Sequence, residues 1–145
     1  IPISKVHIGA ALASAAPGPI PPALTEFNDD VYLHQTRLWS DAGIERFADL
    51  PDALAAAGAA GAWRVHYHVP LIWEGGNGLA STRDVVDTEF FELVSQVVHH
   101  FEVETYTLSL FPDKSEPDEH ILARELAWVA ERFTAQPAAV PEPEQ

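Results

Sequence analysis

Three segments of this chain, residues 3–8, 63–71 and 101–110, show the alternation of apolar and polar residues that is typical of β-strands. Successive side chains of a strand point to opposite faces, so each segment has one apolar face and one face with ionisable groups. The ionisable faces carry Lys5, His7, Arg64, His66, His68, Glu102 and Glu104. Such groups are costly in a packed sheet unless they pair with each other, with a ligand or with a metal ion. We therefore expect these residues to form one site.

Helical patterns separate and follow the three segments. Asp49 is a typical helix cap, and the alanine-rich stretch after it predicts a helix that runs to Gly58 or Gly61. Residues 81–84 form a capping-box pattern in front of a second helix, and a third helix is expected over residues 115–133. Strands that alternate with helices indicate parallel strands joined in βαβ units.

The predicted fold class is therefore α/β, with parallel strands in the C-terminal three strand–helix units of a (β/α)8 TIM barrel. A doubly wound sheet also fits the pattern. Residues 17–36 are expected to leave the sheet as a proline-rich excursion with a short helix and a strand-like stretch. In this interpretation residues 1–133 are the C-terminal part of the barrel, and residues 134–145 are a disordered Pro/Ala/Glu tail.

Three units are less than half of a barrel, which needs about 250 residues. The chain also has no methionine, and its first residues already have a strand pattern. We therefore expect a fragment whose main partner is the missing N-terminal part of the same barrel.

Composition excludes several classes of protein. The formal charge of −14 repels phosphate backbones and anionic lipid, so neither nucleic acid nor a membrane surface is an expected partner. The chain has no cysteine, which excludes disulfides and thiolate chemistry. It contains no apolar run of the roughly 20 residues that a membrane helix needs, and its start lacks the layout of a signal peptide. The expected location is the cytoplasm.

Histidine nitrogens and carboxylate oxygens suit a divalent ion such as Mn²⁺, Co²⁺, Zn²⁺ or Mg²⁺. The candidate metal ligands are His66, His68, Glu104 and His7. Two alternatives stay open: the histidines can be structural, and the glutamates can form internal salt bridges to Arg64 or Lys5. His99 and His100 end a predicted helix, where a cation suits the helix dipole, and are expected to be structural.

The glycine-rich loop over residues 74–82 is a second candidate site. Its glycines expose backbone N–H groups, and its end opens a predicted helix whose N-terminus favours an anion. The candidate anion- or substrate-binding residues are Gly75, Gly76, Asn77, Ser81 and Thr82, together with His34 from the excursion. The alternative is an ordinary connector followed by an ordinary helix cap.

Several of these motifs together resemble one family. They are residues 5–8, 32–35, 66–71, 79–84, 102–107 and 124–128. The combination is similar to the C-terminal part of the EboE proteins, which are metabolite-traffic proteins of the xylose-isomerase-like TIM-barrel superfamily. The resemblance implies a metal site with Glu104 or Glu102 as the carboxylate of the last strand and His66 or His68 as the ligand before it. It also implies isomerisation or epimerisation of sugars.

The leading hypothesis is a sugar or sugar-phosphate isomerase/epimerase-like protein that handles a small metabolite with a divalent metal. Glu102 is the candidate base, and Lys5 or Arg64 would stabilise oxyanions. One alternative is a non-catalytic metabolite carrier that keeps the pocket, and another is a metal-dependent hydrolase on a barrel.

Overall fold

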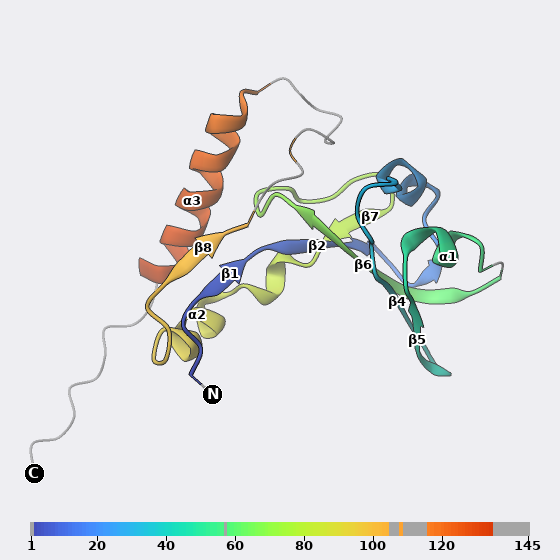
Figure 1. The fold of residues 1–145 in the computed structure, drawn as a ribbon, viewed down its shortest axis with the longest axis horizontal. Coiled ribbons are helices and arrows are strands. Elements are labelled where there is room, and N and C mark those ends of the chain that lie inside the picture. Colours follow the sequence, from blue (N-terminus) through green and yellow to red (C-terminus); the bar gives the residue numbers. More distant parts are fainter. Residues whose placement is uncertain (1, 57, 105–107, 109–115, 135–145) are drawn as a thin grey trace, which may run out of the picture.

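The computed structural model describes residues 2–56, 58–104, 108 and 116–134 of the chain (Figure 1). Its elements in chain order are β1 (Val6–Ile8), β2 (Ala10–Ser14), β3 (Gly18–Pro19), the 3₁₀ helix η1 (Pro22–Phe27), β4 (Thr36–Ser40), β5 (Gly43–Phe47), α1 (Leu50–Leu54), β6 (Ala60–Val69), β7 (Leu79–Ser81), the 3₁₀ helix η2 (Arg83–Val85), α2 (Thr88–Val94), β8 (Phe101–Val103) and α3 (Asp118–Thr134). The predicted tail, 134–145, lies outside the described residues except for its first residue, which ends α3.

Most of these strands form an antiparallel sheet in the order β5-β4-β6-β2-β7, with β3 also paired to β6. A separate pair, β1 with β8, is parallel. The prediction of parallel strand–helix units of a TIM barrel was therefore wrong, and so was the assignment of residues 1–133 to such a barrel.

The physical reason lies between the first two predicted strands. A parallel crossover needs a dozen or more residues, usually as a helix. Here α1 has only five residues, and the preceding residues fold back as the hairpin of β4 and β5. Strand β6 then pairs with the neighbours on both of its sides in the antiparallel direction.

Strands β1 and β2 are two halves of one extended run, interrupted only at Gly9. The first half pairs with β8, in a register that sets His7 opposite Glu102, and the second half pairs with β6 and β7. This run therefore joins the two sheets and brings β8 close to the end of β6.

The apolar faces of the strands build the main core. Leu12, Val65 and Tyr67 are buried there with Phe91 of α2 and Val129 of α3. The sequence of β6 alternates as predicted, since Trp63, Val65, Tyr67 and Val69 are buried while Arg64 and His66 are exposed. Figure 1 shows α3 beside β8 at one end of the molecule and α1 at the other.

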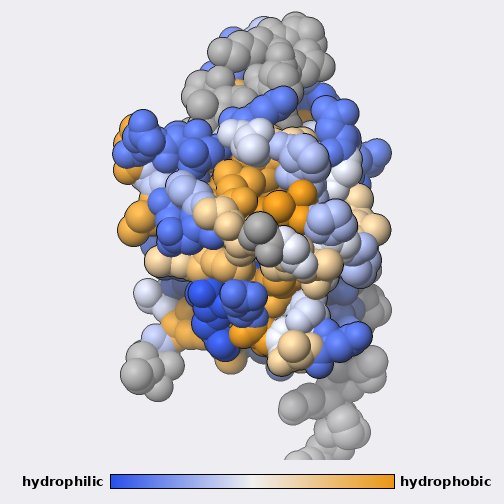
Figure 2. All heavy atoms as spheres, turned by 90° about the vertical axis from the view of Figure 1, so that its right-hand side faces the viewer, coloured by the Kyte–Doolittle hydropathy of each residue, from blue (hydrophilic) through white to orange (hydrophobic). Residues whose placement is uncertain are grey.

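A smaller core lies under α1, where Leu38, Ala53 and Trp63 are buried together. Figure 2 looks at this end of the molecule and shows apolar residues in the middle of the face with hydrophilic residues around them. Asp49 caps α1 as predicted, since its side chain accepts from the Leu50 N–H. The helix ends at Leu54, earlier than the predicted glycines.

The capping-box pattern predicted at residues 81–84 is followed only by the three-residue 3₁₀ helix η2, and not by the longer helix that was predicted. Leu79–Ser81 is strand β7, and the cap of α2 is Asp87, whose side chain accepts from the Phe90 N–H. In front of β7 the chain turns sharply through residues 75–78, all of which have positive φ angles. At Gly75 an added Cβ would lie 2.5 Å from the carbonyl oxygen of Leu79, so only glycine fits there.

The last helix, α3, buries a stripe that contains a charged residue. Leu122 and Leu126 are largely exposed, whereas Glu125 and Val129 are buried. Within the described part of the chain, no helix has the length and apolar character that would let it cross a bilayer.

Candidate functional site: a chain of histidines and carboxylates

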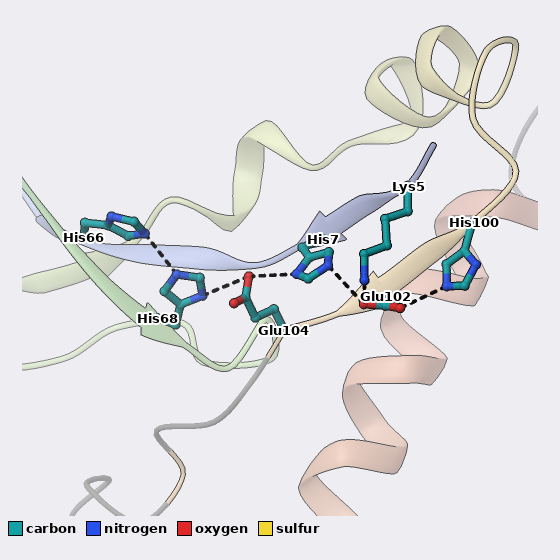
Figure 3. A network of polar contacts seen from close by, with 7 residues as sticks. All are labelled: Lys5, His7, His66, His68, His100, Glu102 and Glu104. Carbon is teal, nitrogen blue, oxygen red and sulfur yellow. Dashed lines mark hydrogen bonds and ion pairs between the residues drawn. The ribbon is translucent and has the colours of Figure 1, made fainter. Parts of the chain in front are cut away.

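Six of the seven ionisable side chains predicted from three strands, all except Arg64, meet in one series of polar contacts (Figure 3). At one end, Nε2 of His66 lies 3.1 Å from Nε2 of His68. Nδ1 of His68 then lies 3.8 Å from Oε2 of Glu104, and the same oxygen lies 3.5 Å from Nδ1 of His7. The other nitrogen of His7, Nε2, lies 3.0 Å from Oε2 of Glu102.

Glu102 ends this chain with two further partners. Lys5 donates to its Oε2 at 2.8 Å, and Nε2 of His100 lies 3.0 Å from its Oε1. The predicted salt bridge of Glu102 is therefore formed with Lys5. His100 was expected to end a helix; it lies directly before β8 instead, where strand parity puts it on the face of Glu102.

Backbone pairing explains why these groups converge. The parallel register of β1 and β8 sets His7 directly opposite Glu102. The N–H of Glu104 donates to the carbonyl of Ile8 at 2.8 Å, which holds Glu104 one step further along the same face. At Gly9 an added Cβ would lie 3.2 Å from Nδ1 of His68, so the missing side chain lets the imidazole approach the strand.

A cavity of about 180 Å³ opens over the middle of the chain of contacts. Its lining residues are His7, Gly9, Ala10, Ala11, His66, His68, Thr82 and Glu104. Thr82 reaches it from the segment after β7, where its hydroxyl accepts from the Ala11 N–H at 2.9 Å. The volume is large enough for a few water molecules or for part of a small polar ligand.

The two ends of this series of polar contacts, at Glu102 and at His68, differ in their electrostatics. The hydrogen bond from Lys5 lowers the pKa of Glu102, and the one from His100 adds to this effect. A carboxylate with a lowered pKa stays ionised at neutral pH and is a weak proton acceptor. Glu102 is thus better suited to orient His7 than to act as the base.

At the other end, burial lowers the pKa of His68, and nearby His66 lowers it further against the opposing effect of Glu104. Only 16% of the His68 side chain is exposed. His68 is therefore neutral at neutral pH, which is the state of a metal ligand or of a proton acceptor.

The four predicted metal ligands form two pairs, His66 with His68 and His7 with Glu104. Nitrogens 3.1 Å apart, as in His66 and His68, can both lie about 2.1 Å from one ion. The carboxylate of Glu104 lies on the side of the other ring nitrogen of His68, at 3.8 Å, which is too long for a hydrogen bond. Among the described residues no group of three or more histidine or acidic side chains is arranged to hold a metal ion. An ion held by the histidine pair would need water or substrate oxygens as its remaining ligands.

Arg64 takes no part in this series of histidine and carboxylate contacts. Its guanidinium carbon lies 5.1 Å from the centre of the Trp39 ring, and the side chain lines a neighbouring cavity with His66. Of the loop residues predicted to bind an anion, Thr82 lines the cavity beside His68, while Gly75, Gly76 and Asn77 form the turn before β7. Ser81 accepts from the Arg83 N–H.

His34 lies on the other face of the sheet. It is buried, its Nε2 is 2.7 Å from Oδ2 of Asp29, and its ring centroid is 4.8 Å from that of Tyr67. The hydrogen bond from His34 lowers the pKa of Asp29, and burial raises the pKa of Tyr67 to about 12. The structure thus places His34 away from the candidate site.

Comparison with known proteins found no match: no family model, curated protein or solved structure matches this chain. The resemblance to the EboE proteins and to the xylose-isomerase-like superfamily has no support from these comparisons. The antiparallel sheet also contradicts the barrel that this resemblance implied, so it was wrong.

Proposed function

We propose that this protein binds a small hydroxy-carbonyl metabolite, such as a sugar or sugar phosphate, with a divalent metal ion at the cavity between His66, His68 and Glu104. We further propose that it moves a proton on this ligand, as an isomerase or epimerase does. The observation that carries the proposal is the convergence on one small cavity of imidazoles from β1 and β6 and of the Glu104 carboxylate, which directly follows β8.

His66 and His68 would hold the metal through their Nε2 atoms. The metal, when bound, would polarise a carbonyl oxygen of the ligand. The charge of Glu104 would act on His68 from the side of its other nitrogen, 3.8 Å away. Neutral His68 supports this role, because only a deprotonated imidazole nitrogen can ligate.

His7 and Glu104 are the proposed proton carriers. Oε2 of Glu102 lies 3.0 Å from Nε2 of His7, and Nδ1 of His7 faces Oε2 of Glu104 at 3.5 Å. One proton can be held between these two atoms at the wall of the cavity. The pair would take a proton from the carbon next to the carbonyl and return it to the neighbouring carbon or to the opposite face of the same carbon.

A second candidate is a non-catalytic metabolite carrier that uses the same cavity. The observation in its favour is Glu102, which is fixed by Lys5, His7 and His100 and whose pKa is lowered. Such a carboxylate binds and orients but does not readily accept a proton.

Calorimetric titration with Mn²⁺ and Zn²⁺ tests the metal. We expect His68→Ala and His66→Ala to weaken binding at least about tenfold, and the exposed His120→Ala on α3 to leave it unchanged. Equal affinity in all variants would overturn the metal site.

Hydrogen exchange in D₂O tests the chemistry. With a panel of aldoses, ketoses and their phosphates, NMR should show deuterium entering next to the carbonyl of one of them. Glu104→Gln should abolish this exchange, while His120→Gln should retain it. A sugar that binds without any exchange would contradict the isomerase proposal and favour the carrier.

A further inference from the structure

A row of three arginines crosses the open face of the sheet. The registers of β5 with β4 and of β4 with β6 set Arg46 opposite Arg37 and Arg37 opposite Arg64. These are three of the eight lysine and arginine residues in a chain with a formal charge of −14. Strand parity puts the row on the same face of the sheet as His66, two residues after Arg64.

These arginines differ in their partners from three of the other basic residues. Lys5, Arg83 and Arg124 each form an ion pair with a glutamate. In the described part of the chain, no ion pair joins any of the three arginines of the row to a carboxylate. Like charges directly opposite each other on neighbouring strands destabilise a sheet. The positive charge of the three arginines is therefore not compensated by carboxylates of the described residues, although the chain is rich in acidic residues.

Two of the three side chains are also held in place. Arg37 donates to the carbonyl oxygens of Thr36 at 2.8 Å and of Phe47 at 3.2 Å. Arg64 stands over the ring of Trp39. Such contacts reduce the side-chain entropy that is lost when a guanidinium binds an anion.

A cavity of about 210 Å³ lies beside the row and is lined by Arg37, Arg64 and His66, among others. His66 and Ala11 line this cavity and also the cavity of the histidine–carboxylate site. The two cavities are therefore neighbours across one imidazole. A ligand with a charged end can reach both.

We infer that the arginine row is the binding site for the phosphoryl group of the metabolite, with Arg37 and Arg64 as its principal ligands and Arg46 as an outer charge. This inference rests on the proposed function only for the identity of the rest of the ligand. A phosphoryl group matches the forked guanidinium donors and supplies the negative charge that the row lacks. The substrate class is then a phosphorylated rather than a neutral sugar.

Titration with inorganic phosphate at low ionic strength tests the inference without requiring catalysis or metal. We expect Arg64→Gln to weaken phosphate binding at least about tenfold, and Arg64→Lys to fall between this variant and the wild type, because it keeps the charge but loses the fork. Arg124→Gln changes the net charge equally on α3 and should bind phosphate as the wild type does. If Arg64→Gln does not fold, Arg46→Gln on the exposed edge strand should still weaken binding measurably.

Phosphate titration, together with the metal titration described above, separates the two proposals. His68→Ala should lose metal affinity but bind phosphate within about twofold of the wild type. Wild-type phosphate affinity in Arg64→Gln, or an equal loss in Arg124→Gln, would overturn the arginine site and leave the metal site unaffected. Unchanged metal affinity in His66→Ala and His68→Ala, with phosphate binding still dependent on Arg64, would overturn the proposed function and leave the arginine site unaffected.

Discussion

The carboxylate of Glu125 accepts a hydrogen bond from the backbone N–H of Leu71 at 2.6 Å, and both residues are completely buried. Arg83 donates to the carbonyl oxygen of the same Leu71 at 3.2 Å. Two side chains from distant segments thus hold the backbone just after β6. This point follows His68 by three residues, so the contacts also support the candidate site.

Glu125→Ala should therefore destabilise the protein. The change leaves the buried Leu71 N–H without this partner and creates a void, so we expect a loss of about 1–3 kcal/mol. Urea unfolding measures it. Glu131→Ala, at an exposed position of the same helix, should change the free energy of unfolding by less than about 0.5 kcal/mol. Equal effects of the two substitutions would show that Glu125 does not anchor α3.

Gly9→Ala should weaken metal binding more than it weakens the fold. The new Cβ would lie 3.2 Å from Nδ1 of His68, so the imidazole has to move by a few tenths of an ångström. We expect a loss of about tenfold or less in Zn²⁺ affinity by calorimetry. Gly18→Ala is the matched control, because a Cβ there meets nothing within 4 Å. Unchanged affinity in Gly9→Ala would mean that the exact position of His68 is not needed.

Stability should fall with acidity in a window set by His68. Burial holds the pKa of His68 below its ordinary value of 6.5, so the unfolded chain binds more protons than the folded one as the pH drops below this value. The folded state then loses stability from about pH 6.5 downward, and stability rises with pH through the same window. The lowered pKa of Glu102 acts separately, below its ordinary value of 4.5.

Thermal unfolding between pH 5 and pH 7.5 measures this effect. His68→Gln should flatten the dependence, while His120→Gln should keep the wild-type slope. A slope that is the same in His68→Gln and in the wild type would show that the burial of His68 does not contribute to the pH dependence.

Arg46→Gln should stabilise the ligand-free protein. It removes a like charge directly opposite Arg37, an arrangement that costs about 0.2–1 kcal/mol in a sheet. Urea unfolding in phosphate-free buffer measures the gain, which should shrink when phosphate is added. Arg124→Gln removes a charge that is paired with Glu116 and should give no gain. A less stable Arg46→Gln variant would indicate that the row is not under electrostatic strain.

Much of the candidate site could be predicted from strand parity. The alternation in residues 63–69 placed His66 and His68 on one face, and Glu102 and Glu104 reach the same partner, His7. Glu125 could have been found as well, because it lies four residues from both Ile121 and Val129 on one helix stripe. A charged residue in such a stripe indicates a buried partner.

The arginine row could not be predicted in this way. Arg37 and Arg46 lie in the hairpin of β4 and β5, whose turn at residues 41–42 lacks the usual Asn-Gly or Asp-Gly signal. Their alignment with Arg64 depends on two strand registers. Register describes which residues of two strands lie opposite each other, so it cannot be read from the sequence of either strand alone.

By itself, the sequence determined the local properties of the chain. These are the faces of β6, the cap at Asp49 and the set of ionisable residues available for a site. Each follows from the covalent geometry of a few neighbouring residues. Tertiary structure decided the direction and order of the strands, and with them the fold class. Strand pairing depends on which distant N–H and C=O groups meet, so the same alternating segments fit a parallel barrel or the antiparallel sheet that forms here.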